Sequence, residues 1–122
     1  MPLHQQSRDD IRRRIRWTAT NPLTLHEVIA QLDQQITEGA WHYGVVVDLR
    51  MGILSSEDRN ALIARMRVLS ETHGPHGPVA LVTQPTGVAN AQVFAMRSKD
   101  PHSVEVFWDI EEANRWLDEI SN

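Results

Sequence analysis

The segment Tyr43-Gly44-Val45-Val46-Val47-Asp48-Leu49-Arg50 decides the fold class of this chain. Its three valines are β-branched and too few for a helix. A run that is apolar on both faces is typical of a central strand covered on each side. Asp48 and Arg50 mark the end of this strand, and Pro78-Val79-Ala80-Leu81-Val82 predicts a second buried strand.

Helices are predicted on both sides of these strands. Thr24-Leu25-His26-Glu27 has the spacing of a capping box and begins an amphipathic helix that ends at Gly39. Ser55-Ser56-Glu57-Asp58 opens a second helix, which ends at His73-Gly74-Pro75. A third helix is predicted between Thr86 and Arg97, although two residues in this stretch are poor helix formers.

Two further strands are predicted toward the ends of the chain. Residues 11–19 alternate between arginines and mainly apolar residues, the period of a strand with one wet face, and we expect this strand at an edge of the sheet. Val104, Val106 and Trp108 alternate in a final strand. Asp109 then caps a last helix with a predicted buried face of Ile110, Ala113, Trp116, Leu117 and Ile120. The four tryptophans are predicted to be structural.

The predicted element order is β-α-β-α-β-α-β-α. Parallel strands joined by helical crossovers are the simplest way to fold it. We therefore expect an α/β domain with one open mixed sheet of about four or five strands and helices packed on the sheet. The strands at Val45 and Val79 are expected to be central and parallel, whereas the strand at 11–19 is the candidate for antiparallel pairing.

Composition limits the class of protein. The chain has 122 residues, of which 41% are hydrophobic, so we predict a single domain over 1–122 with residues 1–10 as a polar N-terminal arm. No stretch approaches the roughly 18 apolar residues of a membrane span, and no signal peptide is apparent. The absence of cysteine fits a reducing compartment, and we expect a cytoplasmic protein.

Charge and motifs argue against several classes of partner and cofactor. The net charge is −4, with arginines crowded near the start and carboxylates near the end. Because the basic cluster lacks aromatic platforms and a recognisable motif, we expect no nucleic-acid partner. The six histidines show no metal-binding spacing, and no nucleophile or nucleotide-binding signature is present. We expect no metal, no cofactor and no catalytic residue.

Three segments resemble the SpoIIAA-like proteins of the STAS group: Tyr43–Arg50, Gly77–Val82 and Val106–Leu117. The resemblance implies their fold for the single domain. In the best-understood STAS members, the anti-sigma-factor antagonists, phosphorylation of a serine at the start of the helix after the central strand switches partner binding. Ser55 and Ser56 stand at a comparable place, but this chain has Ser-Ser-Glu-Asp where the antagonist pattern resembles Asp-Ser-Ser-Gly.

The candidate binding site lies at the carboxyl ends of the predicted strands, where open parallel sheets bind ligands. It combines Asp48 and Arg50 with Ser55, Ser56 and Gln84. The structural interpretation is favoured over a ligand site: Asp48 accepts backbone N–H groups, Arg50 pairs to it and Ser55 acts as a helix N-cap. If either serine is phosphorylated, Ser56 is the freer acceptor.

These features predict a non-enzymatic binding or regulatory module of SpoIIAA-like type that acts through protein–protein interaction. The alternative is a small-molecule or lipid-binding protein that uses the cleft at the carboxyl ends of the strands, and the third hypothesis is an enzyme that uses the same groups. The sequence does not identify the partner, the ligand or the oligomeric state.

Overall fold

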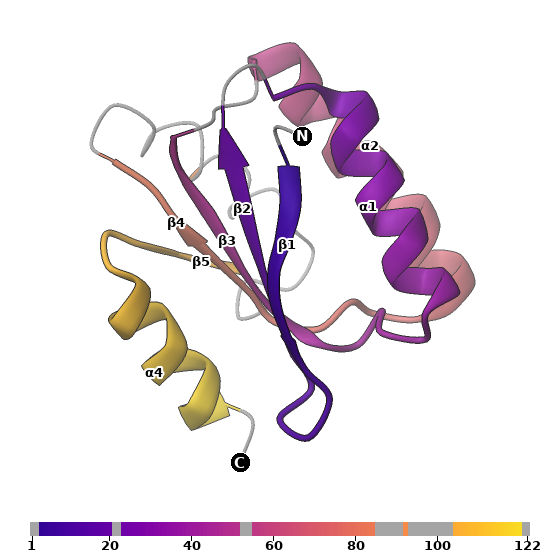
Figure 1. The fold of residues 1–122 in the computed structure, drawn as a ribbon. Helices are drawn as coiled ribbons and strands as arrows, with labels where there is room; N and C mark the ends of the chain where they lie inside the picture. Colours follow the sequence, from indigo (N-terminus) through magenta and orange to yellow (C-terminus); the bar gives the residue numbers. More distant parts are fainter. Residues whose placement is uncertain (1–2, 21–22, 52–54, 85–91, 93–103, 121–122) are drawn as a thin grey trace.

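Five strands form one mixed sheet in the computed structural model, which describes residues 3–20, 23–51, 55–84, 92 and 104–120. The spatial order of the strands equals their order in the chain (Figure 1). The first pair is antiparallel and the other three pairs are parallel. The strands are β1 (Leu3–Asp9), β2 (Arg14–Thr20), β3 (Gly44–Met51), β4 (Val79–Val82) and β5 (Val104–Phe107).

The start of the chain differs from the sequence prediction. Residues 3–9, within the predicted polar arm, form β1, and this strand is the edge strand beside β2. The predicted edge strand at 11–19 begins only at Arg14 and is interior, because β1 covers one side of it and β3 the other. Its pairing with β3 is parallel, so the expected antiparallel strand is β1 instead. The polar composition of β1 concealed it, since Leu3 is the only apolar residue in its sequence.

The two central strands are as predicted. β3 and β4 are interior and parallel, with Val45 opposite Val79 and Asp48 opposite Val82. Alternation along β3 sends Val45 and Val47 to one face and Val46 to the other. Both faces of β3 are therefore covered by apolar packing, which explains its unbroken valine run.

Helices α1 (Leu25–Thr37) and α2 (Ser56–His73) lie on one face of the sheet (Figure 1). Helix α1 connects β2 to β3 and α2 connects β3 to β4, so both connections advance in the same direction across the sheet. Because both connections have the same handedness, both helices lie on the same face. Each begins at the predicted cap: the Thr24 hydroxyl accepts from the backbone N–H of Glu27 at 3.4 Å, and the Ser55 hydroxyl accepts from that of Asp58 at 3.1 Å.

Helix α4 (Ile110–Ile120) lies on the opposite face and packs over β3, β4 and β5 (Figure 1). Ala113 and Leu117 are fully buried, as predicted, but Ile120 is 45% exposed and does not belong to the buried face. The helix predicted between Thr86 and Arg97 falls, except for Gln92, outside the described residues.

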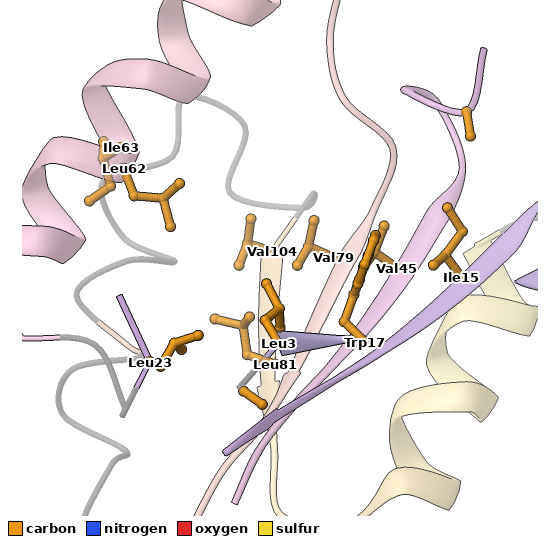
Figure 2. Packing of buried hydrophobic residues seen from close by; sticks show 12 residues of the cluster. Leu3, Ile15, Trp17, Leu23, Val45, Leu62, Ile63, Val79, Leu81 and Val104 are labelled. Atoms are coloured by element: carbon orange, nitrogen blue, oxygen red, sulfur yellow. The ribbon is translucent and has the colours of Figure 1, made fainter. Parts of the chain in front are cut away.

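The larger core lies between the sheet and helices α1 and α2. Figure 2 shows side chains from the strands, among them Ile15 and Trp17 of β2, gathered on this face with Leu62 and Ile63 of α2. The second core, under α4, consists of Val46, Ala80, Val82, Ala113 and Leu117. Trp17 and Trp41 are buried, whereas Trp108 is 56% exposed and is not a core residue. Among the described helices, none is long and apolar enough to cross a membrane.

Candidate functional site

Asp48 and Arg50 lie within β3, which continues to Met51, and not at its end as predicted from the sequence. Asp48 is on the face that α4 covers in part. It is two residues from Val46, so both side chains point to this face. In register, Asp48 stands between Thr18 of β2 and Val82 of β4, and Val82 in turn pairs with Phe107 of β5. These four paired residues lie side by side across the sheet at the position of the candidate site. The residues that follow them in the chain form what is here called the carboxyl edge of the sheet.

The predicted pairing of Asp48 with Arg50 is confirmed. The guanidinium donates from Nε to Asp48 Oδ1 at 3.0 Å and from Nη2 to Oδ2 at 2.8 Å, and the Arg50 backbone N–H donates to Oδ1 at 3.1 Å. Such a two-pronged contact is the strongest geometry for an arginine and a carboxylate. Because Asp48 is buried and Arg50 is more exposed, the pair presents a fixed cation at the edge.

The pKa of Asp48 reflects opposing effects. Burial by itself raises this pKa, but the hydrogen bonds from Arg50, followed by the charges of Arg50 and Arg16, outweigh burial and hold it below its ordinary value. The hydrogen bond to Asp48 also raises the pKa of Arg50, assisted by the charges of Asp48 and Asp109. Both groups are therefore charged at neutral pH. A carboxylate held in this form is suited to charge pairing and not to proton transfer near neutral pH.

Arg16 joins this pair, although the sequence analysis did not include it in the site. Its Nη2 lies 3.9 Å from Asp48 Oδ2, and its Nε is buried without a hydrogen-bond partner among the described residues. Arg16 pairs in register with Val46, so it shares the face of Asp48. In a parallel pairing of β2 with β3, the even-numbered arginines of β2 and the even-numbered Asp48 lie on one face of the sheet. This shared even numbering is the sequence signal that could have placed Arg16 at the site.

Ser55 and Ser56 begin α2, which follows β3 in the chain, but no described interaction joins them to Asp48 or Arg50. Both serines are exposed, and the Ser55 hydroxyl is engaged as the cap. Gln84 is also exposed and lies two residues beyond Val82, the last residue of β4 and the residue that pairs with Asp48. We expect no phosphate at Ser56 or Ser55, and intact-mass analysis of the protein from its native cell would test this expectation.

The cap gives the first stability prediction. Ser55→Ala removes the acceptor for the Asp58 N–H, and we expect the free energy of unfolding to fall by about 1 kcal/mol. Ser56→Ala is the matched control, because Ser56 is exposed and does not cap the helix, and its effect is expected within about 0.5 kcal/mol of zero. Urea unfolding of the two variants checks this. Equal losses would contradict the assignment of Ser55 as the cap.

Acid should weaken the fold through Asp48. Its pKa is lowered in the folded protein, so its stabilising effect is complete above the unfolded-state pKa, about 3.9, and is lost as the pH falls through the lower folded-state pKa. We expect the stability gap between the wild type and Asp48→Asn to narrow progressively below about pH 5. Urea unfolding across this range measures the gap, and two curves that stay parallel would contradict the prediction.

Two large apolar side chains are exposed at the same edge. Met51, the last residue of β3, is 65% exposed, and Trp108, directly after β5, is 56% exposed. Both lie past the row that contains Asp48 and Phe107. The charge of Asp109, next to Trp108, acts on Arg50. The edge therefore combines a fixed arginine with exposed aromatic and thioether groups.

A second polar cluster, which the sequence analysis missed, lies at the opposite edge. Arg8 bonds to Asp10 through Nε at 2.7 Å and to Glu38 through Nη1 at 2.6 Å. The Tyr43 hydroxyl donates to Asp10 at 2.7 Å, and the Arg8 guanidinium lies 5.4 Å from the centroid of the Tyr43 ring. Hydrogen bonds from Tyr43 and Arg8 lower the pKa of Asp10. This cluster ties the β1–β2 hairpin to the end of α1 and the start of β3.

Within the described part of the chain, no group of three or more His, Cys, Asp or Glu side chains could hold a metal ion. Comparison with known proteins finds no matching family model, no matching curated protein and no matching solved structure.

Proposed function

We propose that this chain is a non-enzymatic regulatory module of SpoIIAA-like type that binds a protein partner at the carboxyl edge of its sheet. The observation that carries the proposal is the exposure of two large side chains, Met51 and Trp108, at the edge of the sheet that also carries the Arg50 guanidinium. Tryptophan, methionine and arginine are the residue types enriched in protein interfaces, and tryptophan and arginine dominate their energetic centres.

The chemistry of Asp48 supports binding over catalysis at this edge. Its carboxylate accepts three hydrogen bonds from Arg50 and is held ionised. A general acid or base works best with a pKa near the operating pH. The pKa of Asp48 is lowered and so lies further from neutral pH than that of an ordinary aspartate. The pair instead orients Arg50, which can form a charged contact with a carboxylate of the partner.

The experiment compares partner binding by variants of exposed residues. Tagged wild-type protein first isolates the partner from the native cell, and the affinity of purified variants for that partner is then measured. Trp108→Ala should weaken binding by about tenfold or more, as expected for an interface centre. Val68→Ala on α2 is the control, because Val68 is also exposed, at 53%, but lies on a different element. Equal affinities of the two variants would refute the proposed surface.

A small-molecule ligand at the same edge is the second candidate, and Arg16 is the observation that favours it. Its ion pair with Asp48 is long, at 3.9 Å, so its guanidinium retains capacity for an anionic group. Titration with inorganic phosphate and with a dicarboxylate would test this alternative. Saturable binding that Arg16→Gln abolishes supports it, and absence of binding by the wild type refutes it.

A further inference from the structure

The amino-terminal edge of the parallel strands carries an exposed basic turn. Ile11, Arg12 and Arg13 form the turn between β1 and β2, here called the hairpin tip, and all three are exposed. Ile11 is 96% exposed, the highest value among the large hydrophobic residues that the structure describes. The φ angle of Arg13 is 56°, in the left-handed region that non-glycine residues rarely adopt.

The acidic residues next to the hairpin tip are engaged within the chain. The Asp9 carboxylate accepts from the backbone N–H groups of Ile11 and Arg12, each at 3.0 Å, and Asp10 bonds to Arg8. The side-chain ion pair of Arg12 with Asp9 is long, at 3.9 Å. No ion pair joins Arg13 to any carboxylate in the described residues. The arginines of the tip therefore present positive charge outward from a turn that is itself held in place.

Helix α4 presents the opposite charge. Its exposed side carries four carboxylates and one arginine, Arg115. The carboxylates, here called the acidic stripe, are Glu111, Glu112, Asp118 and Glu119. None of the three glutamates forms an ion pair with another residue that the structure describes. Ile120, at the end of the stripe, is 45% exposed.

The hairpin tip and the end of the acidic stripe are neighbours in one copy of the chain. Arg14, directly after the tip, bonds to Asp118 of α4 through Nη1 at 2.8 Å. Figure 1 shows the β1–β2 turn and the C-terminal end of α4 beside each other at the bottom of the molecule. The basic hairpin tip and the acidic stripe therefore meet at this end of the molecule.

We propose that this surface is self-complementary and joins two copies of the chain about a two-fold axis. In this arrangement the hairpin tip of each copy lies on the acidic stripe of the other, so each charge contact is made twice. Ile11 of one copy packs near Ile120 of the other and adds apolar contact at the centre of the two charged regions. The hairpin tip and the C-terminal end of the acidic stripe lie at the edge opposite Met51, whereas Glu111 and Glu112, at the start of α4, are close in the chain to Trp108.

The dimer is weak and sensitive to salt. A stable interface buries roughly 1,200–2,000 Å² in total, and a contact of one turn and one side of a helix per copy is small by that measure. Association should therefore become measurable at about 10 μM to 1 mM of the full chain. Because the charges are exposed, raising the salt from about 0.1 M to 1 M, which shortens the screening length from roughly 10 Å to 3 Å, should dissociate it.

Charge reversal tests the proposal with a rescue. One variant carries Arg12→Glu and Arg13→Glu, and the other carries Glu112→Lys and Glu119→Lys. Each variant alone places like charges against each other and should be monomeric in sedimentation velocity, with a dissociation constant at least about tenfold above that of the wild type. An equimolar mixture restores both attractive contacts and should sediment as a dimer.

A charge reversal elsewhere is the control. Glu71→Lys, at an exposed position on α2, should leave the dimer of the wild type unchanged, and melting curves should show that all variants fold. Wild-type protein that remains monomeric up to about 1 mM at low salt overturns the proposal. Reversed variants that dimerise as well as the wild type, or a mixture that stays monomeric, overturn it equally. These outcomes do not depend on Trp108, so they are separate from those of the partner-binding test.

Discussion

Val46→Asp is expected to leave no cooperatively folded protein. Val46 is 1% exposed and packs under α4 with Ala80, Val82 and Leu117. A carboxylate at this place replaces apolar packing under α4, and the cost of burying its charge, at least about 4 kcal/mol, is a large part of the 5–15 kcal/mol that stabilises a typical domain. Circular dichroism with thermal unfolding measures the outcome.

The matched control for Val46→Asp is the same change at Val68, which is 53% exposed on α2. Val68→Asp should fold and melt within a few degrees of the wild type, because its carboxylate remains in water. A Val46→Asp protein with a cooperative transition close to that of the control would show that β3 is not covered on its α4 side.

Gly77→Ala should be strongly destabilising, by about 3 kcal/mol. A Cβ on Gly77 would clash with the carbonyl oxygens of Tyr43 and His42 and would lie 2.7 Å from the His42 carbonyl carbon. These are backbone atoms next to β3, and Gly77 itself donates its N–H to the Trp41 carbonyl at 3.3 Å. The clash can be relieved only by moving the loop before β4 away from the start of β3.

Gly44→Ala is the control for the glycine substitution. The nearest atom to a Cβ at Gly44 is a methyl carbon of Leu117 at 3.5 Å, an ordinary van der Waals distance. We expect a loss below about 1 kcal/mol for Gly44→Ala. Equal losses for the two variants in urea unfolding would mean that the close approach at Gly77 does not determine its cost.

The predictable parts of the fold were those with a strong local pattern. The valine run of β3 and the apolar run of β4 are buried on both faces, and the serine and threonine caps lie at the first turns of α1 and α2. β1 was not predictable in the same way. Its residues are mainly polar, and it is a strand because its backbone pairs with β2, a non-local contact that periodicity does not report.

Exposure at the ends of elements was also mispredicted. Trp108 and Ile120 continue the apolar periodicity of β5 and α4, but each lies where its element passes beyond the packed layers. Periodicity gives the direction of a side chain and not whether another element covers it. At the candidate site, Asp48 and Arg50 are close in sequence and could be paired from sequence alone. Arg16 comes from another strand, and its place required the parallel register of β2 and β3.

The proposed dimer surface and the proposed partner-binding surface are related through the places of their exposed residues on the sheet. Met51 and Trp108 lie at the carboxyl edge, and the hairpin tip lies at the start of β2, where Arg14 pairs with Gly44. A dimer formed through the hairpin tip would present two copies of the carboxyl edge to a partner. Two linked sites raise the apparent affinity for a partner that can reach both.

Site-specific photo-cross-linking in the native cell tests the central proposal, partner binding at the carboxyl edge, most directly. A photoreactive phenylalanine analogue replaces Trp108 in one variant and Val68, the exposed control on α2, in the other. We predict one discrete covalent adduct with a protein partner for the Trp108 position and none for the Val68 position. Identical adducts at both positions, or no adduct at Trp108 while the Val68 position reacts, would contradict the proposal.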